Sequence, residues 1–193
     1  MSLAQTSGVT LLGFLTIQET QDNSGYLGSC MVTDLRGNPL EFRVLTPVKP
    51  TPLQRILYGD GFERYIAIEL CGKKLLKEIS RKPSIVLVDR RELLELAAEL
   101  PNTVTVIHLR RPGDAVAVKE ERKGALDIEE GRFEPTSGSI QPVIWEGAFL
   151  TETKKKEVLP LLSSCLQELD LVEVFSRMRA AVQLLAKNDA KYR

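Results

Sequence analysis

The sequence contains few residues of the kinds that build metal sites and redox centres. It has three cysteines and one histidine in 193 residues. Cys30, Cys71 and Cys165 are widely spaced and form no Cys-x-x-Cys pair, which argues against a zinc ribbon and a thioredoxin-type redox site. The single histidine, His108, cannot supply a His-rich metal site. We therefore expect three free thiols, buried or half-buried, in a protein of a reducing compartment.

Long apolar runs and the common nucleotide-binding loops are also absent. The apolar run at residues 9–17 is too short to span a bilayer, and the first basic residue is Arg36, so a secretory signal is not indicated. The sequence has no Gly-x-Gly-x-x-Gly, no Walker A loop and no Gly-x-Ser-x-Gly elbow, which argues against dinucleotide sites, P-loop sites and serine hydrolases. We expect a cytoplasmic protein with no membrane partner.

No excess of charge of either sign is present. The chain has 26 basic and 26 acidic residues, so the argument for nucleic-acid binding from a basic domain does not apply. Basic clusters do occur, and we interpret them as solvated, with neutralisation of phosphates near the sheet loops as the alternative. They are Lys73-Lys74, Arg81-Lys82, Arg90-Arg91, Arg110-Arg111 and Lys154-Lys155-Lys156.

What is present begins with strand signals. Residues 9–19, 26–33 and 40–45 are apolar or alternating runs, and turn-forming residues separate them. The segment 34–39, Asp-Leu-Arg-Gly-Asn-Pro, has the residues that tolerate special backbone angles. Three strands joined by short turns predict an antiparallel meander.

The pattern then changes to one of helices and buried strands. Thr51 can cap a short helix that Pro52 opens, and residues 62–79 have the apolar spacing of a longer helix. The run Ile85-Val86-Leu87-Val88 has no polar alternation, which is typical of a strand buried on both faces. A helix at 90–100 and a strand at 103–109 follow.

The remainder of the chain is a polar stretch and then a helical tail. Residues 140–149 are a strand candidate, and Asp170 with Glu173 resembles a capping box that divides the tail into two helices. We expect an α/β core at 1–109, a β-rich polar insertion packed on it at 110–149, and C-terminal helices at 150–193. Together they are expected to form one compact unit.

The predicted order is three antiparallel strands, helix, buried strand, helix and strand, followed by late helices. Over residues 9–109 this order resembles the ribonuclease H-like fold. The resemblance implies an α/β fold with a mixed sheet, in which a three-stranded antiparallel meander is joined by parallel strands. In that superfamily, carboxylates on the first strand, the first long helix and the fourth strand gather two Mg²⁺ ions for phosphodiester cleavage.

Two residues of this sequence fit that pattern. Glu69 is on the predicted long helix, and Asp89 closes the buried apolar run, where ligand sites gather in α/β sheets. The resemblance implies that both are catalytic residues and ligands of Mg²⁺, which prefers oxygen donors. The first strand departs from the pattern, because its nearest acids, Glu19 and Asp22, lie at its end and beyond it. The other interpretation is that Glu69 is a solvated helix residue and Asp89 a helix cap.

An apolar stripe marks the last predicted helix. A stripe of this kind is usually core or a dimer interface, and a groove for a partner helix is the third possibility. We predict that the stripe contributes to an interface with a second copy or another protein, with closure of the domain's own core as the alternative. Its residues are Leu171, Val174, Phe175, Met178, Val182 and Leu185.

Two functions remain at this point. The first is a non-catalytic interaction or assembly subunit, favoured by the missing first-strand aspartate and by a protein partner for the stripe. The second is a metal-dependent nuclease of ribonuclease H-like fold, or a degenerate descendant of one, acting on nucleic acid with Mg²⁺ as cofactor. The sequence does not decide whether the protein is an enzyme.

Overall fold

The chain starts with the predicted antiparallel meander, in a computed structural model that describes residues 10–114, 126–136, 138–149 and 151–192. β1 (Leu12–Glu19) pairs antiparallel with β2 (Tyr26–Thr33), which pairs antiparallel with β3 (Pro39–Val44). In the turn between β2 and β3, the Asp34 carboxylate accepts hydrogen bonds from the backbone N–H groups of Arg36 and Asn38. Gly37 adopts a φ of 81°, which explains the glycine there.

Parallel strands extend the sheet from β1. β4 (Ile85–Val88) pairs in parallel with β1, and β5 (Thr105–Arg110) pairs in parallel with β4. All four residues of β4 are at most 2% exposed, because the sheet is covered on both faces. The carboxyl ends of β1, β4 and β5 therefore meet at the same edge of the sheet.

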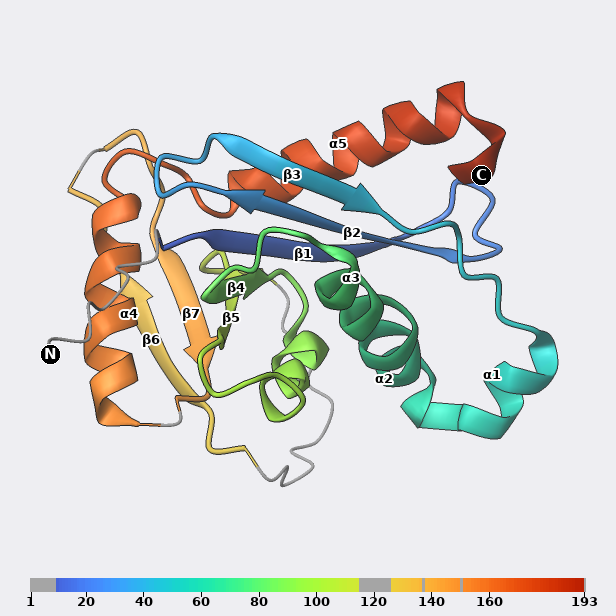
Figure 1. The fold of residues 1–193 in the computed structure, drawn as a ribbon, viewed down its shortest axis with the longest axis horizontal. Helices are drawn as coiled ribbons and strands as arrows, with labels where there is room; N and C mark the ends of the chain where they lie inside the picture. Colours follow the sequence, from blue (N-terminus) through green and yellow to red (C-terminus); the bar gives the residue numbers. More distant parts are fainter. Residues whose placement is uncertain (1–9, 115–125, 137, 150, 193) are drawn as a thin grey trace, which may run out of the picture.

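The polar stretch adds two further strands to the same sheet. β7 (Val143–Gly147) pairs antiparallel with β5, and β6 (Glu129–Phe133) pairs antiparallel with β7. The sheet has the order β3-β2-β1-β4-β5-β7-β6 (Figure 1). Because β7 continues the ladder of β5, these strands belong to the main sheet and do not form a separate layer.

The helices cover both faces of the sheet. Those that follow β3 and β4 in sequence pack on one face, and α4 and α5 pack on the other, as Figure 1 shows. The helical elements are α1 (Pro52–Tyr58), η1 (Gly59–Gly61), α2 (Phe62–Tyr65), η2 (Ile66–Gly72), α3 (Lys73–Glu78), η3 (Arg91–Ala98), α4 (Glu152–Cys165), α5 (Glu173–Asn188) and η4 (Ala190–Tyr192).

Several predicted helix ends coincide with observed ones. The Thr51 hydroxyl accepts a hydrogen bond from the Gln54 N–H in a complete capping box at the start of α1. The Asp170 carboxylate accepts hydrogen bonds from the N–H groups of Val172 and Glu173, just before α5.

The predicted helix at 62–79 is one helical segment whose middle, η2, is a π-helix, and the helix predicted at 90–100 is the 3₁₀-helix η3. Gly72 marks the close approach of these two elements, since a Cβ there would lie 2.8 Å from Leu96 Cδ1.

The apolar stripe of α5 lies inside the chain's own core. Four of its six residues pack on the face of the sheet that carries Phe14, whose ring centroid is 5.6 Å from that of Phe175 in an edge-to-face contact. Leu171, Val174, Phe175 and Val182 are 0% exposed and Met178 is 1% exposed, whereas Leu185 is partly exposed. The sheet therefore already covers the surface on which an interface was predicted. None of the helices within the described residues is long and apolar enough to cross a membrane.

Glu41 lies on β3, a strand at the edge of the sheet, and it bonds to the backbone of the loop between α3 and β4. Its carboxylate accepts hydrogen bonds from the backbone N–H groups of Arg81, at 2.8 Å, and Ser80, at 3.0 Å. These hydrogen bonds lower the pKa of Glu41 to about 2, and the bond from Arg81 has a larger effect than the bond from Ser80. A carboxyl group whose pKa is lower in the folded state stabilises the fold when the pH is above its unfolded-state pKa. This stabilisation is lost as the pH falls towards about 2.

We therefore expect Glu41→Gln to lower the free energy of unfolding at neutral pH by about 1 kcal/mol, because a charge-assisted acceptor is lost. The wild-type protein should lose this difference between about pH 4.5 and about pH 2. Urea denaturation of both proteins across this range measures it. Glu78→Gln, an exposed change on α3, is the control. Parallel pH profiles for wild type and Glu41→Gln would contradict the assignment.

Candidate functional site

Asp89 directly follows β4 at the edge where the parallel strands end. The register of β1 and β4 pairs Leu15 with Val88, so the next residues, Thr16 and Asp89, lie side by side. Leu15 and Ile17 face the core under η2, and Thr16, between them, faces α5 because side chains alternate along a strand. This edge of the sheet thus places a hydroxyl and a carboxylate together beneath the last helix.

A cation from α5 completes the group. The Thr16 hydroxyl donates a hydrogen bond of 2.6 Å to Asp89 Oδ2, and the Arg179 guanidinium donates to the same oxygen in an ion pair. Thr16 is 0% exposed. Burial raises the pKa of Asp89, against the opposing effects of the Thr16 hydrogen bond and the Arg179 charge. The other oxygen, Oδ1, is buried and has no hydrogen-bond partner among the described residues.

A second charged group lies beside the first, on β5 and β7. Glu146 is 4% exposed and accepts a hydrogen bond of 2.8 Å from Arg91 Nε. His108 Nδ1 lies 3.4 Å from its Oε2, and Arg110 Nε lies 3.6 Å from its Oε1. His108, which has the larger effect, and Arg91 lower the pKa of Glu146 to about 2, although burial opposes them. Glu146 thus bonds to Arg91, whereas His108 Nδ1 and Arg110 Nε make no hydrogen bond among the described residues.

The two groups border one recess of about 340 Å³. Four arginines and three carboxylates line it, and a fourth carboxylate, Glu146, pairs with Arg91 and Arg110. The Arg90 side chain forms no hydrogen bond or ion pair with any part of the chain that the structure describes. The lining residues are Asp89, Arg90, Arg91, Glu92, His108, Leu109, Arg110, Asp114, Val172, Phe175 and Arg179.

Glu69 and Asp89 are not brought together. Glu69 is exposed on η2, where its carboxylate accepts a hydrogen bond of 2.8 Å from Lys73 Nζ. η2 packs on the face of the sheet opposite to α5, and Glu69 does not border the Asp89 recess. Asp89 does not cap η3 either, since η3 begins without a side-chain capping bond and the Asp89 carboxylate binds Thr16 and Arg179.

The side chains around Asp89 do not fit the pair of Mg²⁺ ions that the fold family implies. Such ions need several carboxylates in joint reach. Thr16 supplies a neutral hydroxyl from the first strand, and Arg179 places a positive charge against the one carboxylate. Among the described residues, no three His, Cys, Asp or Glu side chains are grouped so as to hold a metal ion.

Thr16 and Arg179 belong to this group, although their positions in the sequence do not mark them as site residues. Two weak signals were present. Thr16 is a polar residue in the middle of an apolar run, and Arg179 is a charge within the stripe, four residues after Phe175. Neither signal distinguishes a site residue from an ordinary surface residue. The contact joins residues 16, 89 and 179, which are far apart in the sequence and meet only in the folded chain.

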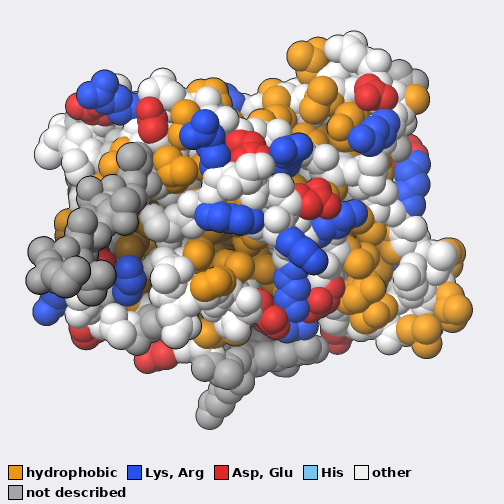
Figure 2. Space-filling model, in the orientation of Figure 1, with side chains coloured by type: hydrophobic (Ala, Val, Ile, Leu, Met, Phe, Trp, Pro, Cys, Tyr) orange, Lys and Arg blue, Asp and Glu red, His pale blue; other side chains and the backbone are white. Residues whose placement is uncertain are grey.

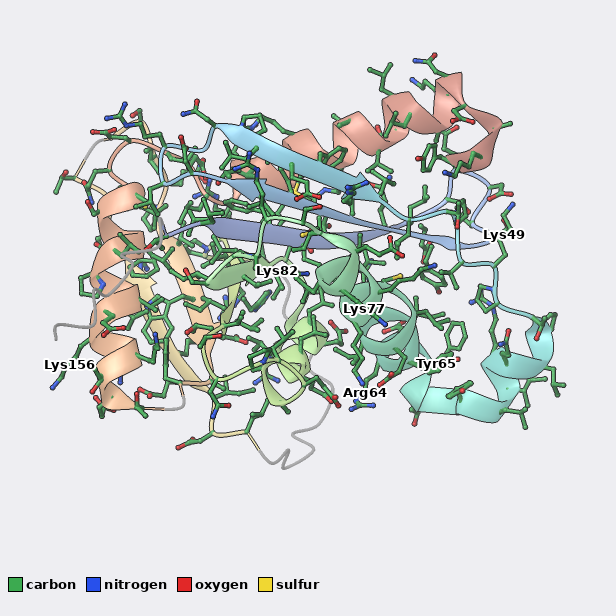
Figure 3. The ribbon with its side chains drawn as sticks, in the orientation of Figure 1. Lys49, Arg64, Tyr65, Lys77, Lys82 and Lys156 are labelled. Atoms are coloured by element: carbon green, nitrogen blue, oxygen red, sulfur yellow. The ribbon has the colours of Figure 1, made fainter. Side chains whose placement is uncertain are left out.

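Most basic clusters lie away from this site. Figure 2 shows lysines, arginines and acidic side chains interspersed over the face that carries α2 and α3. Arg64, Lys77 and Lys82 lie on this face (Figure 3), where Arg64 pairs with Glu95 and Lys82 Nζ donates to the Leu76 carbonyl at the end of α3. These residues stabilise the helical layer. Only the pairs that contain Arg90, Arg91 and Arg110 contribute to the Asp89 recess.

Comparison with known sequences gives a limited result. No protein-family model matches the chain. A stretch of 133 residues, 63% of the chain, is 27% identical to the probable translation initiation factor IF-2 of Methanoregula boonei. The match spans 22% of the length of that factor, so it assigns no function to this chain.

Comparison with solved structures supports the fold. Endonuclease V of Bacillus subtilis aligns with a TM-score of 0.59 at 12% identity, over 94% of this chain and 84% of that one. Endonuclease V of Streptomyces avermitilis aligns with a TM-score of 0.49 at 11% identity, over 93% and 84% of the two chains. At such identities the likeness concerns the fold alone. The chain therefore has an α/β fold of ribonuclease H-like type, with a mixed sheet and a helical C-terminal end.

Proposed function

We propose that this protein is a degenerate descendant of a ribonuclease H-like nuclease, which binds nucleic acid at the Asp89 recess without two-metal catalysis. The observation that carries the proposal is the Asp89–Arg179 ion pair, with Thr16 as the third member. A guanidinium bound to the carboxylate satisfies the charge that a metal ion would otherwise neutralise. Asp89 is thereby held by the protein itself.

The arginines of the recess support a phosphate-bearing ligand. A guanidinium presents a planar fork of N–H donors that matches phosphate oxygens. Arg90 has no ion pair within the described chain, and Arg91 and Arg179 are 45% and 40% exposed, so their donors are accessible. The likeness in fold to an endonuclease favours nucleic acid over other phosphate compounds as the ligand. This step rests on fold analogy.

Binding to labelled single-stranded DNA or RNA of about 20 nucleotides, measured by fluorescence anisotropy, tests the proposal. We expect binding with EDTA present that weakens as salt rises, because released counterions drive the association. Arg90→Glu should raise the Kd about tenfold, since it reverses a charge in the recess without breaking an ion pair. Lys77→Glu, a charge reversal on α3 (Figure 3), which packs on the other face of the sheet from α5, should leave the Kd unaltered. Equal effects of the two changes would refute the recess as the binding site.

A metal-dependent nuclease is the second candidate, and the fold of the endonuclease favours it. The same oligonucleotides incubated with Mg²⁺ or Mn²⁺ distinguish it from the first. Cleavage that requires the ion and disappears in Asp89→Asn would replace the proposal. If neither binding nor cleavage occurs, a protein interaction becomes the better explanation, as the sequence suggested.

A further inference from the structure

A second recess lies at the opposite end of β5. It has a volume of about 240 Å³ and is formed by the end of η3, the residues before β5 and β6, the residues after β7 and the first turn of α4. Thr105 begins β5 and Arg110 ends it, which at about 3.3 Å per residue separates the two recesses by roughly 16 Å. The second recess is thus distinct from the Asp89 recess. It is lined by Ala97, Asn102, Val104, Thr105, Leu126, Asp127, Ala148, Phe149 and Lys154.

Three polar side chains of this recess have no side-chain partner among the described residues, whereas Lys154 Nζ lies 3.4 Å from Glu157 Oε2. Neither Asn102, Thr105 nor Asp127 forms a side-chain hydrogen bond or ion pair within the described residues. Thr105 is 7% exposed and lines the recess. A ligand that enters the recess can supply the hydrogen bonds that these side chains do not make within the described residues.

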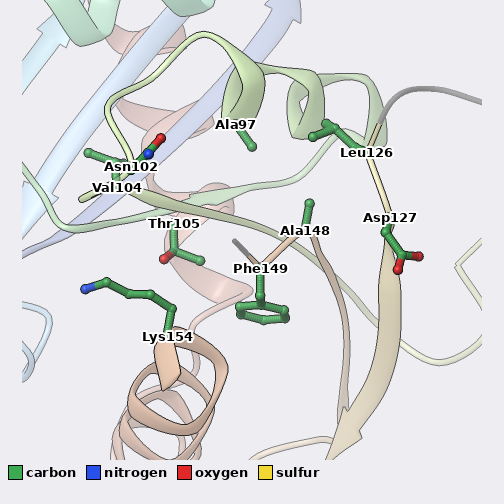
Figure 4. Close-up of a pocket in the computed structure, with 9 residues that line it drawn as sticks. All are labelled: Ala97, Asn102, Val104, Thr105, Leu126, Asp127, Ala148, Phe149 and Lys154. Atoms are coloured by element: carbon green, nitrogen blue, oxygen red, sulfur yellow. The ribbon is translucent and has the colours of Figure 1, made fainter. Parts of the chain in front are cut away.

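The arrangement of these groups indicates a ligand with an anionic end and a flat body. Figure 4 shows Asn102, Thr105 and Lys154 on one side of the recess and Asp127 on the other, with the Phe149 ring between them. An amide, a hydroxyl and an ammonium together offer donors to a phosphate. The ring supplies a face on which a nucleobase can stack. Asp127 can accept a hydrogen bond from an amino or hydroxyl group.

We propose that this recess binds one nucleotide, with its phosphate at Lys154, Thr105 and Asn102 and its base against Phe149. The volume of the recess is near the lower limit for ligand pockets. A recess of this size admits a single nucleotide and excludes a duplex. The nucleotide is either free or the phosphorylated end of a strand, since both present the same chemistry. The site does not depend on the Asp89 recess.

Isothermal titration with the four ribonucleoside 5′-monophosphates tests the site, alongside the matching nucleosides and inorganic phosphate. We expect monophosphates to bind at least tenfold more tightly than nucleosides or phosphate alone. Lys154→Ala and Thr105→Val should each weaken binding about tenfold, because each removes one donor to the phosphate. Lys156→Ala, on the same helix (Figure 3), and Arg90→Glu, in the other recess, should leave it unchanged.

A 5′-phosphorylated dinucleotide distinguishes the two sources. If it competes with the mononucleotide, a strand end is accepted; if only the mononucleotide binds, the ligand is free. Both results support the site. Failure of monophosphates to bind at millimolar concentration, or equal binding by Lys154→Ala, overturns it. Because Arg90→Glu tests the Asp89 recess separately, loss of this site leaves the proposed function standing.

Discussion

Replacing Thr16 by Asp and Arg179 by Glu together is expected to create a divalent-metal site at Asp89. The double variant adds carboxylates on β1 and α5 beside Asp89 and removes the guanidinium that now neutralises it. With EDTA the three acids repel one another, and the melting temperature should fall below that of the wild type. With millimolar Mn²⁺ the melting temperature should rise by about 5–10 °C, because binding at 100 times the Kd stabilises the native state by about 2.7 kcal/mol.

The control for this experiment is Thr16→Asn with Arg179→Gln, which has similar shapes and no added charge. It should show no response to Mn²⁺, as should the wild type. Differential scanning fluorimetry with and without the ion measures all three proteins. A wild-type shift as large as that of the double variant would mean that Asp89 binds metal with its present partners, and the metal-free proposal would then be wrong.

Phe175→Glu is expected to lower the melting temperature by roughly 10 °C or more, or to prevent folding, without altering the oligomeric state. Phe175 is 0% exposed and packs edge-to-face on Phe14 beneath α5. The change removes an aromatic side chain from the core and buries an unpaired charge, which costs about 4–5 kcal/mol. The destabilisation acts within the chain because the sheet, and not a second copy, covers this residue.

Leu184→Glu is the matched control, since Leu184 is on the same helix and is 60% exposed. It should change the melting temperature little. If Phe175→Glu does not fold, Phe175→Leu should still lower stability by about 1 kcal/mol, through the same lost contacts. Thermal melts and light scattering measure both properties. A folded Phe175→Leu protein with wild-type stability and weaker self-association would restore the predicted interface.

The local signals in the sequence were sufficient for much of the fold. The continuous apolar run at residues 85–88 predicted a buried strand, and β4 is that strand. Thr51 and Pro52 predicted the start of a helix, and α1 begins there with the expected cap. These features depend on residues close in sequence, whose backbone preferences and hydrogen bonds operate whatever the rest of the chain does.

The two residues predicted for the site, Glu69 and Asp89, lie in different parts of the structure. Asp89 lies in a recess at the carboxyl end of a central strand, as its position after β4 suggested. Glu69 lies elsewhere, because the helix that carries it packs on the opposite face of the sheet. Helical periodicity tells which side of a helix is apolar, but it does not tell which face of a sheet the helix will cover.

The sequence by itself determined the element order, the ribonuclease H-like arrangement and the apolar side of α5. Only the tertiary structure decided that this apolar side closes the domain's own core and that Arg179 meets Asp89. The physical reason is the distance along the chain. The group of Thr16, Asp89 and Arg179 depends on the register of β1 with β4 and on the rotation of α5 about its axis. Both are fixed by packing of the whole sheet, so no local segment of the sequence determines either of them alone.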